Sequence, residues 1–364
     1  MTQQVTQSEF PCQQCGGKMA FNPSGGNITC QYCGHVNLIA QSQQPAEELD
    51  YHAFLARQAE HAESIEAITI TCSGCGAVTN LPPDITADKC PFCGSPVVTQ
   101  GESGKLIKPK SVLPFAVNKT TAFGAFRKWT ASRWFAPGRF ARAARTDSSS
   151  LAGMYIPHWT YDCAASTSFK GQRGDNYTET ETYTTTENGQ QVTRTRHVTK
   201  VRWTYVEGTV RDDFDDVLVL ASRSIPRKQS DRLEPWKLED LQPYDEKYMA
   251  GFRCESYQIG LEEGFATAKE KMAPTITRSI ERAIGGDRQR VDSQHTTYSD
   301  ITFKHVLLPV WISAYRFGDK VFRFLVNART GEVQGERPWS IWKIVAFAGS
   351  IAAAVAGTIY LLAR

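Results

Sequence analysis

The sequence lacks the short motifs that carry the chemistry of common enzyme classes. It contains no serine or cysteine nucleophile motif, no His-Glu-x-x-His motif and no dinucleotide fingerprint. Residues 101–105 have only part of a phosphate-binding loop, because Thr99 stands where the first glycine belongs and Leu106 replaces the Ser or Thr that holds magnesium. We therefore expect no catalytic residues and no enzymatic activity.

Acidic residues are absent from one long stretch. Between Ser103 and Thr146 there is no Asp or Glu, although ten basic residues occur there. Over residues 121–145 the basic residues alternate with aromatic ones, namely Phe123, Phe126, Trp129, Trp134, Phe135 and Phe140. This pattern is typical of a helix whose aromatic residues enter the core, of a surface that meets anionic lipid, and of a surface that stacks nucleic-acid bases. The sequence favours these readings in that order.

A secretory signal is also missing, because the first seven residues are polar and carry neither a basic region nor an apolar run. Cysteines in a reducing compartment are expected to stay free of disulfides. A redox pair is disfavoured as well, since it more commonly occurs once, beside a βαβ pattern. Of the ten cysteines, Cys163 and Cys254 are expected to be reduced core residues.

The other eight cysteines form four Cys-x-x-Cys-Gly motifs, and 14 residues separate the two motifs of each half. This spacing lets two tight turns face each other across one tetrahedral ion, and the glycines suit turns that need a positive φ. The predicted ligands are Cys12, Cys15, Cys30 and Cys33 for one ion, and Cys72, Cys75, Cys90 and Cys93 for the other. Two structural Zn²⁺ ions are the expected cofactors, with iron as the alternative in the same thiolate cage.

The C-terminal end carries a long uncharged run. From Ile344 to Leu362 there are 19 residues without a charge. As a helix they would span about 28 Å, close to the ~30 Å of a bilayer core. Trp339, Trp342 and Lys343 precede the run, as is typical of residues at a membrane interface. We expect a tail-anchoring transmembrane helix over 344–362, and the alternative is a buried Ala-rich core helix.

Two hints predict the orientation of that helix. Arg337 and Lys343 outweigh Arg364 under the positive-inside rule. Thiolate ligands also need a reducing compartment. The expected localisation is the inner membrane of the cell, crossed once, with the bulk of the chain in the cytoplasm.

The chain between the two ends predicts an α+β fold. Zinc ribbons are expected at residues 8–40 and 68–100, joined by a helix over 45–67, where helix-forming residues are abundant and glycine is absent. A mixed domain of strands and helices is expected at 106–340. Apolar residues at helical spacing predict a core helix over 260–284.

Three apolar segments of this domain share a strand-like signature around a proline. They are Val112–Phe115, Tyr155–Trp159 and Leu307–Trp311, and we interpret them as a faint duplication. Proline in such strands predicts edge or first positions, because it donates no hydrogen bond to a neighbouring strand. The aspartates between 212 and 216 predict a solvated acidic turn, since the spacing of a calcium-binding loop is missing.

A long hairpin is expected over residues 177–205, turning at Asn188 and Gly189. A two-residue loop places Glu181 opposite Arg196. One face then carries tyrosines and paired charges, and the other carries threonines. Neither face is apolar enough for a core, so the hairpin should project into solvent or meet a partner.

The motifs at Cys30–Gly34 and Cys90–Gly94, the Tyr155–Trp159 segment and the C-terminal run together resemble a bacterial family of membrane-anchored double zinc-ribbon proteins. Its members carry labels such as TFIIB-type zinc ribbon or primosomal protein N′, the replication-restart helicase. This chain lacks the ATPase motors of that helicase, so its activity does not transfer. Over its full length the chain is similar to proteins encoded beside phage-shock A-like and SPFH (flotillin-like) proteins in envelope-stress operons. The resemblance implies a membrane adaptor that recruits such partners.

Two classes of function remain. The first is a non-enzymatic, zinc-binding adaptor or scaffold that recruits protein partners to the cytoplasmic face of the membrane. The alternative is a nucleic-acid-binding zinc-ribbon protein of the replication- or transcription-factor type, without helicase activity. Residues 12–33 contain only Lys18 as a basic residue, and residues 72–93 only Lys89. Because such ribbons release few counterions from phosphates, nucleic acid is the less favoured partner.

Overall fold

The computed structural model describes most of the chain. The described residues are 10–39, 47–58, 64–80, 87–98, 102–107, 109–138, 151–187, 190–317 and 320–362. Among them, twelve strands form one mixed sheet whose central order is β13-β10-β15-β11-β14-β6-β5-β9. Four further strands join this path, since β12 pairs with β11, β4 and β16 with β15, and β17 with β16.

The sheet draws its strands from almost every part of the chain. In chain order they are β4 (Leu49–Asp50), β5 (Ser64–Thr71), β6 (Val78–Asn80), β9 (Glu102–Ile107), β10 (Ser111–Val112), β11 (Ala152–Glu187), β12 (Gln190–Leu220), β13 (Gln242–Pro243), β14 (Arg253–Glu255), β15 (Arg288–Phe317), β16 (Lys320–Asn327) and β17 (Val333–Gly335). Smaller sheets are formed by β1 (Met19–Asn22), β2 (Asn27–Cys30) and β3 (Val36–Leu38), and by β7 (Ala87–Lys89) and β8 (Pro96–Val98).

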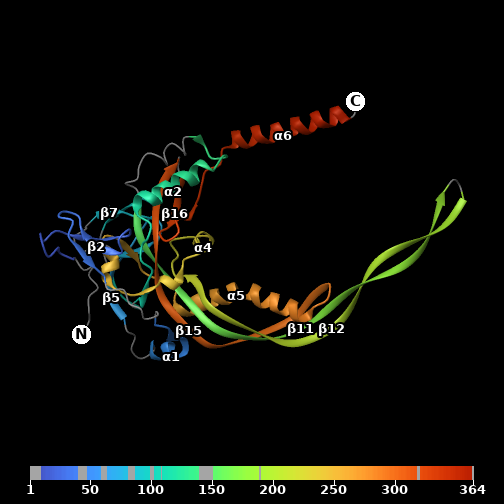
Figure 1. Ribbon diagram of the computed structural model, residues 1–364, viewed down its shortest axis with the longest axis horizontal. Coiled ribbons are helices and arrows are strands. Elements are labelled where there is room, and N and C mark those ends of the chain that lie inside the picture. Colours follow the sequence, from blue (N-terminus) through green and yellow to red (C-terminus); the bar gives the residue numbers. More distant parts are fainter. Residues whose placement is uncertain are drawn as a thin grey trace.

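The helices lie around this sheet. They are α1 (Tyr51–Gln58), α2 (Lys119–Ala131), α4 (Arg227–Asp231), α5 (Leu261–Ile284) and α6 (Ile341–Leu362), with 3-10 turns η1 (Leu238–Asp240) and η2 (Glu246–Met249). Helix α5 runs along the strands β11, β12 and β15 (Figure 1) and buries its apolar stripe, including Phe265, Met272 and Ile280, against them. The core helix predicted over 260–284 is therefore confirmed, and the sheet-rich α+β class with it.

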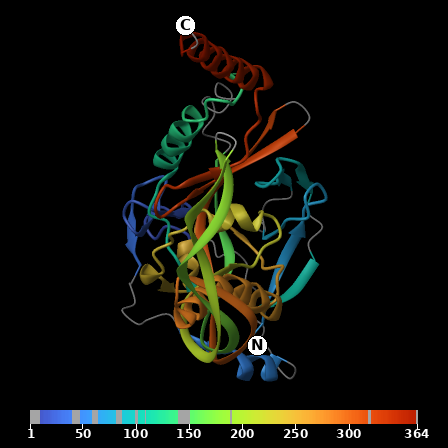
Figure 2. The same ribbon diagram turned by 90° about the vertical axis from the view of Figure 1, so that its right-hand side faces the viewer.

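The two N-terminal ribbons attach to the body in different ways. The first ribbon has its own sheet, β1-β2-β3, and its Phe21 packs edge-on against Tyr248 and Phe252. The second ribbon shares the main sheet, because β6 pairs with β14 through Asn80 and Cys254. Seen from the end of the molecule, the two ribbons lie on opposite flanks of the body (Figure 2).

The segment between the ribbons differs from the predicted helix over 45–67. Helix α1 occupies only Tyr51–Gln58, and residues 64–71 form strand β5. The side chain of Asp50 accepts a hydrogen bond from the backbone N–H of Ala53 and so caps the start of α1. Five of the seven residues from Ile65 to Thr71 are β-branched, which suits a strand, and pairing with β6 and β9 outweighs the helix propensity of Glu66 and Ala67.

The prediction of edge or first positions for the strand prolines is wrong for Pro157, which lies inside the central strand β11. On one side of β11, the partner strand β14 ends its pairing at Tyr155 and β12 begins at His158. The Pro157 carbonyl accepts from the Ala221 N–H on that same side. The N–H that Pro157 lacks would therefore point into the gap between β14 and β12, so no hydrogen bond is lost.

Pro309 repeats this arrangement in β15, the other central strand. There β10 ends its pairing at Leu307, β16 begins at Val310, and the Pro309 carbonyl accepts from the Ala328 N–H. Strands β11 and β15 are antiparallel neighbours, so the two interruptions flank the centre of the sheet. This symmetry supports the duplication suggested by the sequence.

The hairpin of β11 and β12 forms a long arm. Strand β15 accompanies its root only as far as the pairing of Gly174 with Arg288, and beyond that point β11 and β12 pair alone. The arm and α6 both extend from the body toward the same side (Figure 1). The predicted register is confirmed, because Glu181 lies opposite Arg196 and accepts a hydrogen bond from its guanidinium at 3.0 Å. The predicted turn at 188–189 lies outside the described residues.

Helix α2 contains the first part of the aromatic and basic stretch at 121–145 and shows which aromatic side chains there enter the core. Asn118 caps the helix by accepting from the Thr121 N–H, and Phe126 is buried, with its ring stacked 3.5 Å from that of Phe324. Trp134 follows the helix and is 73% exposed. The core reading thus holds for Phe126 but not for Trp134, and residues 139–145 lie outside the described residues.

A buried carboxyl group lies where the second ribbon joins the sheet. Glu255 ends β14, and its Oε1 accepts hydrogen bonds from the hydroxyls of Ser222 and Ser224. Its Oε2 has no hydrogen-bond partner among the described residues. Burial raises the pKa of Glu255 from 4.5 to about 7.

We expect Glu255→Gln to remove a pH dependence of stability. The folded protein holds the Glu255 proton up to about pH 7, whereas the unfolded chain releases it near 4.5, so wild-type stability falls as the pH rises between these values. The variant should therefore gain about 2–3 kcal/mol of unfolding free energy relative to wild type between roughly pH 5 and pH 8. Urea unfolding at several pH values measures this difference.

The matched control is Glu281→Gln, which changes an exposed glutamate on α5. Its difference from wild type shows how much the loss of a surface carboxyl group contributes by itself. A difference for Glu255→Gln that changes with pH no more than this control would contradict the assignment.

Candidate metal centres

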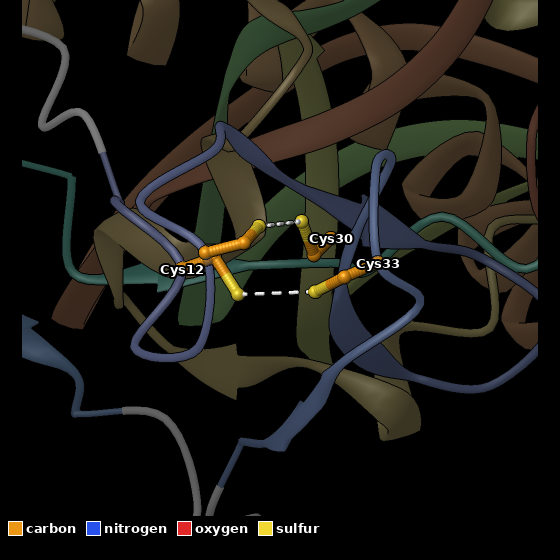
Figure 3. A group of neighbouring side chains, drawn as sticks. Cys12, Cys30 and Cys33 are labelled. Carbon is orange, nitrogen blue, oxygen red and sulfur yellow. Dashed lines mark hydrogen bonds between the residues drawn. The ribbon is translucent and has the colours of Figure 1, made fainter.

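The four cysteines of the first ribbon come together at one point. The Sγ atoms of Cys12 and Cys33 lie 3.5 Å apart, as do those of Cys15 and Cys30. Figure 3 shows Cys12, Cys30 and Cys33 with their sulfurs turned toward one another. The sulfurs of a tetrahedral zinc site with Zn–S bonds of about 2.3 Å are separated by about 3.8 Å. A disulfide needs about 2.05 Å, so the spacing fits a metal cage and not a bridge.

The second ribbon repeats this geometry. The Sγ atoms of Cys72 and Cys93 lie 3.6 Å apart, and those of Cys75 and Cys90 lie 3.7 Å apart. In each site all four sulfurs lie within 4.8 Å of one another. The structure thus brings together both predicted sets of ligands. Each cluster is a site for one Zn²⁺.

The backbone of each turn explains the glycine that follows each cysteine pair. Gly16, Gly34, Gly76 and Gly94 have φ values of 71°, 75°, 72° and 72°, which side chains with a Cβ rarely adopt. Each glycine N–H donates to the carbonyl of the first cysteine in its motif, for example Gly16 to Cys12 at 2.8 Å. The prediction of positive φ is confirmed, and the turns hold their shape through the backbone.

Hydrogen-bond donors lower the pKa of one thiol in each cluster, whereas burial and neighbouring thiols raise the pKa of others, that of Cys75 to about 11. N–H groups of Cys33 and Tyr32 lower the pKa of Cys30 to about 6. At Cys93 burial opposes ionisation, but the hydroxyl and N–H of Ser95 outweigh it and lower the pKa to about 7. The cysteine spacing does not point to Ser95, although its hydroxyl two residues after the last cysteine is a signal in the sequence.

The two sites are closed and differ in their surroundings. The first cysteine of each motif is buried and the second lies nearer the surface, with Cys15 and Cys33 exposed and Cys75 and Cys93 half-buried. Phe92, between Cys90 and Cys93, is fully buried in the core that also contains Leu113 and Met154. Four thiolate ligands complete the coordination of a tetrahedral ion, as is typical of structural zinc sites.

A third group of possible ligands consists of Asp162, Asp215 and Asp216. Asp162 lies in β11, and Asp215 and Asp216 lie in its neighbour β12. The acidic turn predicted between 212 and 216 is therefore wrong. The Lys304 ammonium, only 7% exposed, lies 2.8 Å from Asp216 Oδ1 and 3.1 Å from Glu48 Oε1. Asp162, Asp216 and Glu48 therefore form an ion-pair network around Lys304.

The other feature predicted from the sequence is the C-terminal helix. Helix α6 has 22 residues, is long and apolar enough to cross a membrane, and buries none of its apolar window inside the protein. The alternative of a buried core helix is therefore wrong. The helix begins at Ile341, three residues before the predicted span of 344–362.

Comparisons with known proteins support the zinc ribbon at the second metal centre. Residues 68–102 match the family description "FORGETTER1 second zinc ribbon domain". The chain is 31% identical over 345 residues to the uncharacterized protein YdjG of Bacillus subtilis (strain 168), and the match covers 94% of each chain. No solved structure matches the chain significantly.

Proposed function

The chain belongs to the family of Bacillus subtilis YdjG, and on that premise we propose that it is a non-enzymatic adaptor, anchored in a membrane by α6, whose zinc-folded ribbons recruit protein partners. The observation that carries this proposal is the exposure of α6. An apolar helix of 22 residues that meets the described body at its start, and buries none of its apolar window there, leaves a large apolar area in water. Burying such area is favourable by about 25 cal/mol per Å², and a bilayer offers a matching thickness.

The orientation of the anchor follows from charge and redox chemistry. Arg337 and Lys343 lie on the body side of α6, which supports a cytoplasmic body under the positive-inside rule. Free thiolates at both metal centres also suit a reducing compartment. The ribbons are then held at the cytoplasmic face of the inner membrane.

The first ribbon offers a surface for a protein partner. Tyr32, in the second cysteine turn, is 78% exposed, and Leu38, at the end of β3, is 82% exposed. Val36 on the same strand is 47% exposed. Large apolar side chains on a rigid, metal-folded unit resemble the anchors of protein interfaces. Few basic residues accompany them, which supports a protein partner over a nucleic acid.

The class of partner rests on the family resemblance seen in the sequence. That resemblance supports phage-shock A-like or SPFH (flotillin-like) proteins and a role in envelope stress.

We expect Tyr32→Ala/Leu38→Ala to lose a specific partner while keeping two zinc ions. The variant removes exposed side chains and leaves the cysteine cage and the buried Phe21 untouched. Full-length wild type and variant are captured from membranes in mild detergent, and the bound proteins are identified by mass spectrometry. A partner present with wild type and reduced at least about tenfold with the variant fits the loss of two interface anchors.

The matched control is Tyr183→Ala/Val192→Ala, which removes exposed side chains from the arm. It should keep the partner. Equal capture by both variants would contradict docking by the first ribbon, and salt-sensitive recovery of DNA or RNA in place of a protein would favour the nucleic-acid alternative.

A further inference from the structure

The start of α6 is held against the turn that follows α2. The Lys343 ammonium donates to the carbonyls of Trp134 and Ala136 at 3.0 and 2.8 Å. The Ser340 N–H donates to the Phe135 carbonyl at 2.8 Å, and the Phe135 ring packs edge-on against Phe347. Two segments that lie about 200 residues apart in the sequence therefore meet where α6 leaves the body.

Two guanidinium groups lie at this junction. The Arg133 guanidinium lies 4.9 Å from the centre of the Trp129 ring, and that of Arg337 lies 4.2 Å from the centre of the Trp339 ring. The Arg133 Nε is buried and has no hydrogen-bond acceptor among the described residues. Neither arginine forms an ion pair with a carboxylate of a described residue.

The two arginines also influence each other. Partial burial, and then the positive charge of Arg133, lower the pKa of Arg337. The stretch from 103 to 146, which contains Arg133, carries no acidic residue that could compensate this charge. Each guanidinium is positioned by a tryptophan ring, and neither has a carboxylate partner among the described residues, so this junction favours a ligand that brings negative charge.

Exposed tryptophans surround the same junction. Trp134, Trp339 and Trp342 are 73%, 57% and 84% exposed, and all three lie within a few residues of Arg133, Arg337 or the first turn of α6. Tryptophan prefers the interface between lipid headgroups and hydrocarbon. Guanidinium groups at that depth meet phosphates.

We propose that Arg133 and Arg337 bind the phosphate of an anionic phospholipid at the point where α6 enters the membrane. This inference rests on the proposed anchoring by α6. Planar guanidinium groups suit the paired oxygens of a phosphate, which a single lysine cannot match in geometry. The site continues directly into α6, so a lipid headgroup reaches it without leaving the bilayer, whereas a free anion would gain nothing from the flanking tryptophans. The headgroup would fix the angle at which the body meets the membrane.

The test uses the full chain in lipid nanodiscs. Discs contain phosphatidylcholine alone or phosphatidylcholine with phosphatidylglycerol, and hydrogen–deuterium exchange is followed at backbone amides of 129–136 and 337–340. We expect phosphatidylglycerol to slow exchange in wild type about fivefold or more. The effect should disappear in Arg133→Gln/Arg337→Gln and return in part in Arg133→Lys/Arg337→Lys, which keeps the charge but not the planar fork.

The matched control is Arg127→Gln/Lys128→Gln, which removes two exposed charges from α2. It should keep the effect of phosphatidylglycerol, and both double variants to glutamine should keep two zinc ions. Equal loss in both would indicate diffuse charge attraction and overturn the site. Equal slowing by inorganic phosphate with phosphatidylcholine discs would overturn the lipid assignment.

The anchoring proposal and the lipid site fail in different ways. A full chain that does not enter any disc refutes the anchoring, and the lipid site with it. A full chain that enters both kinds of disc but exchanges equally in them refutes the lipid site alone.

Discussion

Replacing Cys72 and Cys75 with serine is expected to unfold much more than the second ribbon. Strand β6 directly follows these ligands and pairs with β14, which in turn pairs with the central strand β11. Phe92, held between the other two ligands, fills the core beside Leu113. Structural zinc contributes about 10–16 kcal/mol, as much as the whole stability of an ordinary domain, which is about 5–15 kcal/mol.

Loss of this zinc should therefore abolish the cooperative melting of the main sheet. Calorimetry and near-ultraviolet circular dichroism measure the transition, and metal analysis should show one zinc ion per chain in place of two. The reason is that a ribbon without its ion cannot hold β6 and Phe92 in place, so the edge of the sheet and part of the core are lost together.

The matched variant is Cys12→Ser/Cys15→Ser. The first ribbon has its own three-stranded sheet and contacts the body mainly through side chains such as Phe21, with a backbone hydrogen bond from the Phe21 N–H to the Ala250 carbonyl. It should lose one zinc ion and some stability but keep a cooperative transition of the main sheet. Equal damage by the two variants would show that the second ribbon is no more integral to the sheet than the first.

Removing α6 is expected to release the protein from membranes without unfolding it. A chain ending at Ser340 should be soluble, keep two zinc ions and melt close to the temperature of the full chain, because α6 buries none of its apolar window in the body. The full chain should stay in the membrane pellet after a carbonate wash. Fractionation followed by metal analysis measures both properties.

A second pair of variants separates insertion from the mere presence of a helix. Ile351→Arg/Val355→Arg places two charges at the centre of α6, at a cost of about 5–7 kcal/mol for entering hydrocarbon. Ile351→Leu/Val355→Leu keeps the helix apolar and should remain in the pellet. If the arginine variant resists the carbonate wash as well as the leucine variant, α6 does not cross the bilayer.

Local patterns in the sequence were sufficient to predict the metal ligands. The spacing of Cys12, Cys15, Cys30 and Cys33, and of their four counterparts, constrains two turns around an ion whatever surrounds them. The register of Glu181 with Arg196 was predictable for a similar reason, because a two-residue loop determines every pair that follows it. The apolar stripe of α5 was equally local.

Longer-range features were not accessible in this way. The second ribbon reads as an independent unit, yet β6 joins β14, a strand about 175 residues later in the sequence. Pro157 and Pro309 were predicted at edge or first positions, but they lie in central strands. Each lies where one neighbouring strand ends and the next begins, so no hydrogen bond is lost there. The acidic residues 212–216 were predicted to form a turn, since the sequence does not reveal that Lys304, which pairs with Asp216, comes from the distant strand β15.

The sequence by itself determined the two four-cysteine zinc centres and an apolar helix of membrane length, because both depend on spacing within a few dozen residues. Only the tertiary structure decided that one ribbon is part of the main sheet while the other is docked on the body, and that the turn after α2, which contains Arg133, lies against the start of α6, which follows Arg337. Strand pairing and charge proximity between distant segments depend on the packing of the whole chain. That packing places one zinc ribbon on each flank of the body. It also brings arginine and tryptophan side chains to the start of α6.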